Sequence, residues 1–554
     1  MKNSLFFTLY FIAVCSVKAQ SSLDLTHKAK IDSLFATCDK TNSPGCALGI
    51  IKDGNFIYHR GYGMANLELG ISISPNSVFD IGSTSKQFTA ACIILLQQQG
   101  KLSLDDDVKK YFKELPVYGK PITLRHLLNH TSGLRDYDEL LLFAGYQREQ
   151  VTTEQDAIDI ISRQKALNFP TGSEWVYSNT GFRIASIIIE RISGQSLKVF
   201  AEENIFRPLG MRNTFFLDNH TAVVPYRATG YSPDYEGGFQ INMSHWKGIG
   251  DGALQTNIND LLLWDKNFYD PKVGGKDLIQ NLTNIGVLDK GEKINYGLGL
   301  FKDDFYGLEM ISHSGSFAGY RSELIRIPSE KFSVACLCNL ADLEPREITR
   351  RIAKIVLAYK LKGESARTSM KKGESASIEF LNSVVGNYRN ESGSVLMELK
   401  MEKSELINTY SSSKMIYLGN DEFDAGEKQI IKLVRDKKNN PIAIDLTTNK
   451  NHLKIERMIR YLPLAYSKAE YASAAGRYFS EELNAYYSLA VEESELIMKL
   501  TPNIKWKLNF SPVTKTLFSN PYGVIMELVM NKNNKIEGFL LTFERSRQIT
   551  FQKM

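Results

Sequence analysis

The sequence lacks the features that would assign it to several common functional classes. It has no dense block of lysine and arginine, and its net charge of +5 over 554 residues is small, which argues against a nucleic-acid partner. It contains neither a His-Glu-x-x-His pattern nor a Cys-x-x-Cys pair, so we expect no metal site and no cofactor. Beyond the N-terminus, no uncharged apolar run is long enough to cross a membrane.

Cysteine is scarce, with six residues in the whole chain. The number of cysteines is odd once the first 19 residues are set aside, and a large domain does not need disulfides for stability. Cys336 and Cys338 alternate with apolar residues on a strand-like run, so they share one face. We interpret the cysteines as mostly structural, and a Cys38–Cys46 bridge stays open.

The N-terminus has the pattern of a signal peptide over residues 1–19. Lys2 is followed by an apolar stretch from Leu5 to Val14 and by the small-residue site Val17-Lys18-Ala19. The apolar stretch is too short to span a bilayer, so we expect an exported protein, periplasmic or secreted. A lipoprotein signal with Cys15 as the lipidated residue is a weaker alternative, because Val14 is a poor residue before it. A buried N-terminal helix is a third.

The rest of the chain divides by composition. Residues 20–362 mix helical and strand patterns, and the polar segment 363–377 repeats the string KGESA, which is typical of a linker. The remainder contains a repeat of about 90 residues, in which Gly386-Asn387-Tyr388 recurs as Gly476-Arg477-Tyr478. Alternating apolar and polar residues favour short strands there. We therefore expect two small antiparallel barrels, over 378–460 and 465–554.

Within 20–362, strands are expected near both ends and helices between them. The patterns predict strands at 46–52, 56–61, 322–327 and 332–339, and a closing helix from Pro345 to about Leu361. Length and composition favour several domains over a single core. A sheet formed by both ends of this region, with a helical insertion, is an α/β + α architecture.

The first candidate for chemistry is Ser83, with Lys86 three residues later. An apolar run begins at Phe88, so Ser83 is expected at a helix N-terminus with Lys86 on the same face. A lysine made neutral by burial can take the proton of a serine hydroxyl, and the Ser83 backbone N–H can stabilise an oxyanion. Alone the pattern is weak, since Ser-x-x-Lys also occurs at Ser369 and Ser411, and an N-cap serine would look the same.

Two further segments offer groups that could work with Ser83. Tyr177 can relay a proton and Asn179 can hold a substrate carbonyl or amide, although a core tyrosine beside a capping asparagine is the simpler reading. His313-Ser314-Gly315-Ser316 is predicted at the start of a late strand. Gly315 there would let a substrate backbone approach, and the Ser316 N–H could complete an oxyanion hole. The alternative for His313 is a structural histidine.

Together the three segments resemble the serine β-lactamase and penicillin-binding-protein superfamily, nearest its class C-like branch. Its signatures Ser-x-x-Lys, Tyr-x-Asn and Lys/His-x-Gly match at Ser83, Tyr177 and His313. Segments 127–134 and 250–256 also look like family segments, and the resemblance covers about 45–361. It implies a β-lactamase-like catalytic domain in which Lys86 and Tyr177 share the base role, Asn179 orients the substrate, and the amides of Ser83 and Ser316 form the oxyanion hole. We interpret His130 as a structural turn residue.

One departure bears on the substrate. The β-lactamases of this branch have lysine where this sequence has His313. In having a histidine at this position, the sequence resembles the D,D-carboxypeptidase and D-aminopeptidase members instead. The two barrels resemble the paired lipocalin-like domains of D-aminopeptidases. The resemblance thus implies an exported serine hydrolase that acts through an acyl-enzyme on small peptides, amides or esters, with substrates containing a D-residue favoured. The alternatives are a small-ester esterase, a weak β-lactamase, or a non-catalytic protein that binds peptidoglycan fragments. Nothing in the sequence specifies an oligomeric state.

Overall fold

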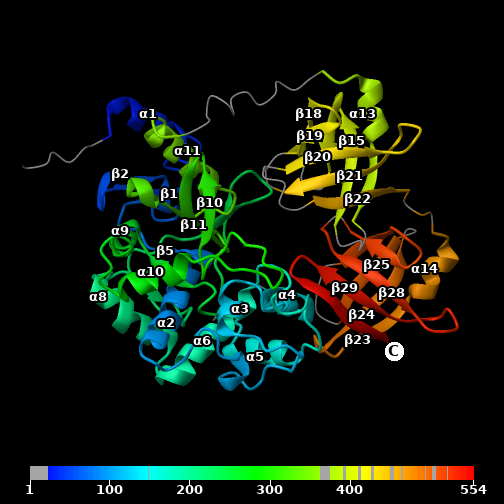
Figure 1. Ribbon diagram of the computed structural model, residues 1–554, viewed down its shortest axis with the longest axis horizontal. Helices are drawn as coiled ribbons and strands as arrows, with labels where there is room; N and C mark the ends of the chain where they lie inside the picture. Colours follow the sequence, from blue (N-terminus) through cyan, green and yellow to red (C-terminus); the bar gives the residue numbers. More distant parts are fainter. Residues whose placement is uncertain are drawn as a thin grey trace, which may run out of the picture.

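The computed structural model describes residues 23–361 and 375–554, with short gaps at 148, 247, 391–394, 410–412, 426–428, 449–454, 463, 465, 493–494, 502–506 and 521. The expected signal peptide, with Cys15, and most of the expected linker lie outside the described residues. Figure 1 shows a mixed α/β part followed by two β-rich parts, coloured yellow and red. Within the described chain, no helix is both long and apolar enough to span a membrane.

A six-stranded antiparallel sheet forms the frame of the first part. Its order is β10-β11-β12-β13-β1-β2, so the first strand pairs with the last one of this region. This confirms the expected sheet built from both ends of the region. The strands are β1 (Cys46–Lys52), β2 (Asn55–Tyr62), β10 (Phe301–Phe305), β11 (Leu308–Phe317), β12 (Tyr320–Ile327) and β13 (Phe332–Cys338).

Helices cover both faces of this sheet and fill the insertion. Helix α1 (Leu25–Ser33) and helix α11 (Pro345–Leu357) pack on one face through Ile31 and Ile352, in a core shared with β1, β12 and β13. Helix α9 (Ile258–Asn267) packs against β1 and β13 from the helical side. The other helices are α2 (Lys86–Gln98), α3 (Leu124–Leu128), α4 (Tyr137–Ala144), α5 (Glu154–Ser162), α6 (Asn179–Ser193), α7 (Leu197–Ala201), α8 (Arg207–Leu209) and α10 (Gly275–Thr283).

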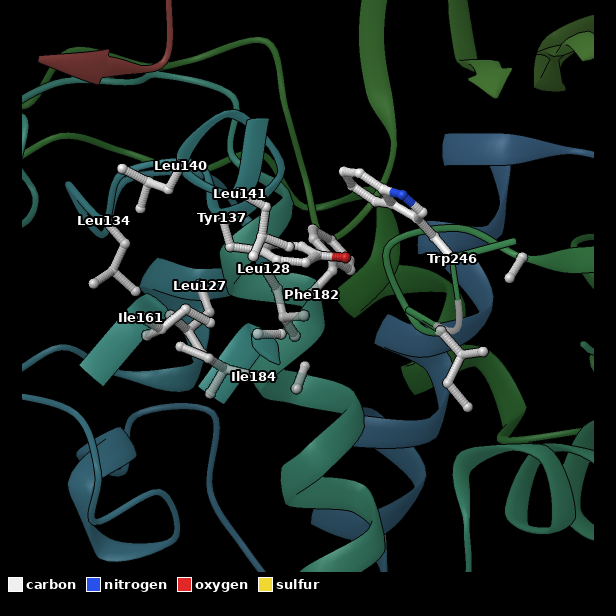
Figure 2. Packing of buried hydrophobic residues seen from close by; sticks show 14 of the residues in the cluster. Leu127, Leu128, Leu134, Tyr137, Leu140, Leu141, Ile161, Phe182, Ile184 and Trp246 are labelled. Atoms are coloured by element: carbon white, nitrogen blue, oxygen red, sulfur yellow. The ribbon is translucent and has the colours of Figure 1, made fainter. Parts of the chain in front are cut away.

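The core of the helical insertion is apolar and continuous. Figure 2 shows Tyr137 of α4 beside Leu128 of α3 and Phe182 of α6, with further leucine and isoleucine side chains below them. Short strands lie between the helices and the main sheet. They are β3 (Met64–Asn66), β4 (Ile71–Ser72), β5 (Phe79–Asp80), β6 (Phe215–Phe216), β7 (Tyr231–Pro233), β8 (Phe239–Ile241) and β9 (Leu254–Thr256).

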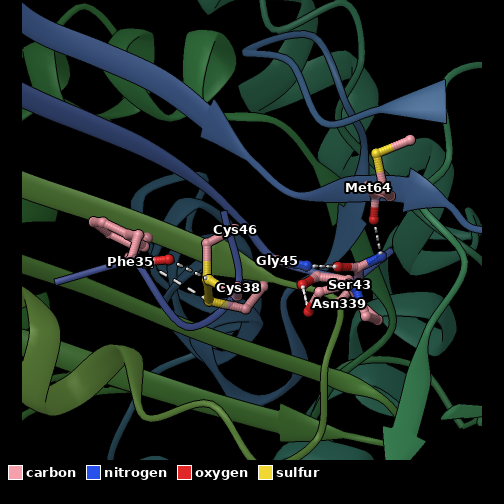
Figure 3. The surroundings of a disulfide bond; sticks show 10 residues. Phe35, Cys38, Ser43, Gly45, Cys46, Met64 and Asn339 are labelled. Atoms are coloured by element: carbon pink, nitrogen blue, oxygen red, sulfur yellow. Dashed lines mark hydrogen bonds between the residues drawn. A yellow bond between two sulfur atoms is a disulfide. The ribbon is translucent and has the colours of Figure 1, made fainter. Parts of the chain in front are cut away.

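A disulfide joins two adjacent strands of the main sheet. Cys46 of β1 is bonded to Cys338 of β13, its direct partner in the strand register. The Cys38–Cys46 bridge left open by the sequence is therefore not formed. Cys38 is a buried thiol that donates to the Phe35 carbonyl over 3.4 Å (Figure 3), and burial raises its pKa to about 11. A thiol with so high a pKa is poorly reactive, in agreement with a structural role.

The first tail unit is a nine-stranded antiparallel sheet with one preceding helix. Its order is β17-β16-β15-β14-β22-β21-β20-β19-β18, which begins and ends with strands adjacent in sequence. Its elements are α13 (Ile378–Val384), β14 (Gly386–Arg389), β15 (Leu396–Glu402), β16 (Glu405–Asn408), β17 (Ser413–Lys414), β18 (Ile416–Gly419), β19 (Glu422–Asp424), β20 (Gln429–Arg435), β21 (Pro441–Thr448) and β22 (Ile455–Tyr461).

The second tail unit is a closed antiparallel barrel, as the repeat predicts. It begins with helix α14 (Lys468–Ala474). Its strands are β23 (Gly476–Ser480), β24 (Ala485–Glu492), β25 (Glu495–Thr501), β26 (Lys507–Pro512), β27 (Leu517–Ser519), β28 (Ile525–Met530), β29 (Ile536–Phe543) and β30 (Ser546–Lys553).

The repeated Gly-x-Tyr string has the same structural role in both units. Tyr388 donates its hydroxyl to the Val384 carbonyl at the end of α13, and Tyr478 donates to Ala474 at the end of α14, each over 2.7 Å. Both tyrosine side chains are fully buried. The string thus fastens the preceding helix to the first strand. The helices themselves were not expected from the sequence.

The second barrel is docked on the helical insertion of the first part. Arg135, just before α4, forms a buried ion pair with Glu482 of the barrel, with Nη1 and Oε1 2.5 Å apart and both side chains at most 2% exposed. Tyr487 of the barrel donates its hydroxyl to the Phe143 carbonyl of α4. Buried apolar side chains of both parts belong to one continuous core, and Figure 1 shows α4 facing the red barrel.

Replacing Glu482 should therefore destabilise the contact between barrel and insertion. In Glu482→Gln the Arg135 charge stays buried without its carboxylate, which should cost about 1.5 to 3 kcal/mol. The neighbouring pair Lys165–Glu481 is the control, because its side chains are 60% and 72% exposed and exposed pairs contribute little. Thermal melting of Glu482→Gln and Glu481→Gln would measure the loss of stability in each variant. Equal melting temperatures of the two variants would contradict the prediction.

Candidate active site

Ser83 lies in a tight turn directly ahead of the helix that begins at Lys86. The turn is a 3-10 turn over Gly82–Ser85 that runs directly into α2, so Ser83 lies at the N-terminal end of the helix, as the sequence predicted. Gly82 has a φ of 48°, and a Cβ there would lie 2.8 Å from the Ser316 backbone nitrogen. The glycine thus allows the turn to lie against β11, which brings the first and third signature segments together.

The Lys86 ammonium group connects the first and second signature segments. Its side chain is completely buried. Nζ donates to Ser83 Oγ over 3.1 Å, to Asn179 Oδ1 over 2.8 Å and to the Asp251 carbonyl over 2.6 Å. Three acceptors match the three N–H donors of an ammonium group, so the position of Nζ beside Oγ is fully determined. The Asp251 carbonyl was not expected as a partner, although its segment had been recognised.

The Tyr177 ring lies beside Lys86, with Nζ 5.0 Å from the ring centroid. Its hydroxyl is buried and has no hydrogen-bond partner among the residues that the structure describes. The His130 ring packs on the Tyr177 ring at 4.2 Å between centroids, and His130 Nδ1 accepts from the Ser178 N–H over 3.2 Å. Burial and the nearby Lys86 lower the His130 pKa well below its usual value. His130 is therefore neutral, and its ring holds the Tyr177 ring in position by packing against it.

His313 lies in the middle of β11, not at the start of a strand as expected. Nδ1 is 2.6 Å from the Ser314 carbonyl and Nε2 is 2.9 Å from the Tyr296 hydroxyl. Because a carbonyl oxygen only accepts, Nδ1 holds the ring proton and Nε2 accepts from Tyr296. Burial, and then the charge of Lys86, lower the His313 pKa from 6.5 to about 3. The imidazole is thus neutral near pH 7, where a lysine would be charged.

This lowered pKa makes stability depend on pH. Below about pH 6.5 the unfolded chain gains a proton at residue 313 that the folded chain does not bind until about pH 3, so stability falls as the pH drops through this range. His313→Asn should lose less stability than the unmodified protein between about pH 7 and about pH 4.5. Thermal melting at both values measures the difference. His59→Asn, at an exposed position of β2, is the control and should lose as much as the unmodified protein.

Gly315 and Ser316 hold β11 close to the Ser83 turn. A Cβ on Gly315 would lie 1.9 Å from the Ile81 carbonyl oxygen, so the glycine is needed for the approach of this segment. The expectation that it makes room for a substrate backbone is thus corrected in part: its closest neighbour is the chain itself. The Ser316 backbone nitrogen lies against Gly82, the residue before Ser83.

Asn179 is the first residue of α6, and both the oxygen and the nitrogen of its side-chain amide form hydrogen bonds. Oδ1 accepts from Lys86, and Nδ2 donates to Asp138 Oδ2 over 2.9 Å. Its backbone N–H donates to Asp136 Oδ2 over 2.7 Å. These contacts make Asn179 a positioning group for Lys86 before any substrate is considered, which differs from the substrate contact expected from the sequence.

A cavity of about 980 Å³ brings the predicted site residues together. It is lined by Ser83, Tyr177, Asn179, His313, Gly315 and Ser316, and also by Asp136, Asp138 and Glu139. The β29–β30 turn of the second barrel adds Phe543, Glu544 and Arg545. Another cavity, of about 310 Å³, lies against the β1–β2 turn and contains none of these residues. The acidic and barrel residues of the larger cavity had no signal in the sequence analysis.

Comparison with known proteins identifies a family for the first part of the chain. The Beta-lactamase family model matches residues 31–358. The chain belongs to the β-lactamase family. The family and its relatives support a serine hydrolase, which confirms the family resemblance noted from the sequence.

Relatives with known names are similar over part of the chain. Penicillin-binding protein 4* of Bacillus subtilis (strain 168) is 28% identical over 378 residues, which are 66% of this chain and 83% of that protein. A D-aminopeptidase of Gluconobacter oxydans (strain 621H) is 30% identical over 53% of this chain. The chain spans little more than half of that relative's length, 56%.

Solved structures share the fold. The octameric penicillin-binding protein homologue from Pyrococcus abyssi has a TM-score of 0.56 and 23% sequence identity, and covers 87% of this chain and 99% of its own. The D-amino acid amidase from Ochrobactrum anthropi SV3 has a TM-score of 0.52 and 22% identity, and covers 60% of this chain and 99% of its own. At these identities the likeness concerns the fold alone.

Proposed function

We propose that this protein is an exported serine hydrolase that forms an acyl-enzyme on Ser83 and cleaves peptide or amide bonds next to a D-residue. The proposal rests on one observation above the others: Lys86 Nζ lies 3.1 Å from Ser83 Oγ and is held there by Asn179 and Asp251. A nucleophile within hydrogen-bond reach of its base, with the base itself oriented by other groups, is the arrangement that acyl transfer needs.

The reaction follows from these positions. Ser83 Oγ forms a bond to the substrate carbonyl carbon while its proton passes to the pair of Lys86 and Tyr177, which for this step holds one proton fewer than an ammonium group and a phenol together. The backbone N–H groups of Ser83 and Ser316 stabilise the oxyanion. Collapse of the intermediate breaks the bond to the leaving amine, which takes up the proton. Water then attacks the acyl-enzyme and gives a proton to the same pair, and the pair returns a proton to Ser83 Oγ as its bond to the acyl carbon breaks and the acid leaves.

The proposed substrate class is supported by the names of related proteins and by His313. Several relatives are named D-aminopeptidase, and solved neighbours include D-amino acid amidases. His313, neutral and hydrogen-bonded to Tyr296, stands where the class C-like β-lactamases have lysine. We therefore favour peptides and amides over β-lactams. Export is part of the proposal and rests on the N-terminal pattern; N-terminal sequencing of the mature protein should begin at Gln20.

A substrate panel tests the proposal. We expect turnover of D-aminoacyl amides or D-Ala-D-Ala peptides, weaker turnover of p-nitrophenyl esters, and little turnover of a chromogenic cephalosporin. Ser83→Ala should abolish each activity. Ester turnover alone would make the protein an esterase, and labelled Ser83 without any turnover would make it a binding protein.

A further inference from the structure

The turn between β29 and β30 introduces a positive charge into the cavity that contains Ser83. Phe543 pairs with Ser546, so Glu544 and Arg545 form the tip of a tight hairpin. All three residues before Ser546 line the cavity. The Arg545 guanidinium lies over the Tyr177 ring, with Cζ 5.1 Å from the centroid. A residue near the end of the chain thus contacts a signature residue of the active site.

The hairpin is held in place chiefly by hydrogen bonds of its backbone. Glu139 accepts from the Arg545 N–H over 3.1 Å. The Arg545 carbonyl accepts from the Asp136 N–H over 3.2 Å and from Asn168 Nδ2 over 2.7 Å. Arg135 Nε donates to the Arg547 carbonyl over 2.9 Å. The position of the turn is therefore set by the insertion, and the guanidinium is left for another purpose.

The guanidinium has unused donors that face the cavity. Within the described residues no hydrogen bond of this group is recorded, and its only ion pair is a long one, 3.8 Å to Asp136 Oδ2. The Asp136 carboxylate already accepts the backbone N–H groups of Asn179, Asp138 and Glu139, so it does not depend on Arg545. An arginine offers five donors in a planar fork that matches a carboxylate.

We propose that Arg545 binds the free C-terminal carboxylate of a short peptide substrate. The inference rests on the proposed function and narrows it: the enzyme cleaves the bond before a C-terminal residue, and the second barrel supplies the group that recognises that end. The face of the Tyr177 ring packs against the guanidinium, a cation–π contact that aromatic rings commonly make with arginine. Glu544, on the same turn, is the residue that would instead select a substrate amine.

The experiment uses the full-length protein and two matched substrates. One is an N-acyl-D-Ala-D-Ala peptide with a free carboxylate, and the other is the same peptide with a C-terminal amide. We expect kcat/KM to be about 10- to 100-fold higher for the free acid, the size of a charge-assisted hydrogen bond. Arg545→Gln should remove most of this preference, chiefly through KM, and Arg545→Lys should keep part of it. Arg547→Gln is the control, because its side chain pairs with Glu174 and should not affect the preference.

Each other outcome has a definite meaning. Turnover of both peptides with a preference that Arg545→Gln leaves unchanged overturns this inference and leaves the proposed function intact. A preference for substrates with a free amine that Glu544→Gln abolishes also overturns it. Cleavage of neither peptide overturns this inference, and the proposed D-peptidase function falls with it only if the D-aminoacyl amides of the panel are not cleaved either. Melting temperatures of Arg545→Gln and Arg545→Lys show whether both variants are folded.

Discussion

Ser83→Ala is expected to lower kcat by about 10⁴- to 10⁶-fold while the protein stays folded, because the variant has no oxygen to form the acyl-enzyme. Within the described residues Ser83 Oγ takes part in one hydrogen bond, accepted from Lys86 Nζ, so its loss should cost little stability. Steady-state kinetics on the best substrate of the panel gives the first readout. The residual rate should come from the oxyanion donors and from binding, which the substitution leaves in place.

The covalent step gives an independent readout. Incubation with a fluorophosphonate, followed by mass spectrometry of peptides, should place the adduct on the peptide that contains Ser83. Ser314 is a matched control, since its hydroxyl is exposed in the same cavity and the variant Ser314→Ala should be labelled like the unmodified protein. An adduct on any other serine would contradict the assignment of Ser83 as nucleophile.

The parts of the site that could be predicted from the sequence are those fixed by local geometry. Ser83 and Lys86 are three residues apart at the start of a helix, so their contact follows from the chain's own turn. The strands β1, β2, β12 and β13 followed from their apolar runs, and the barrel repeat from the recurring Gly-x-Tyr string. These patterns depend only on neighbours in the sequence.

The parts that could not be predicted depend on how distant segments pack. The Asp251 carbonyl holds Lys86 as a backbone group, and a backbone group has no residue type to recognise. Tyr296 is one tyrosine among 26, and only the fold shows that it holds His313. Cys46 and Cys338 become partners because their strands pair, whereas the sequence only left a Cys38–Cys46 bridge open.

Arg545 is the clearest example of the same limit. The polar linker favoured barrels that fold apart from the catalytic part, and no residue of the barrels was named as a site residue from the sequence. The buried Arg135–Glu482 pair and the shared apolar core show instead that the second barrel completes the cavity wall. Docking of this kind depends on surface complementarity, which leaves no periodic signal in a sequence.

Lys86→Met and Tyr177→Phe are each expected to slow acylation by about 10²- to 10⁴-fold, the usual contribution of general acid–base catalysis. Lys86 Nζ is the donor nearest to Ser83 Oγ, and the Tyr177 hydroxyl is buried beside it without another partner among the described residues. Methionine fills the space of the lysine stem, and phenylalanine removes only the hydroxyl. Burst kinetics with a p-nitrophenyl ester separates acylation from the later steps.

The double variant decides whether the two residues act as one unit. If Lys86 and Tyr177 share a single proton, the second substitution removes little that the first has left, so the double variant should acylate about as slowly as the worse single variant. If the losses multiply, the residues have independent roles, and a shared base is wrong. Lys120→Met is the control for removing a lysine, since Lys120 pairs with Asp289 at an exposed position and lines no part of the cavity. Its acylation rate should equal that of the unmodified protein, so that any loss in Lys86→Met is assigned to the contact between Nζ and Ser83 Oγ.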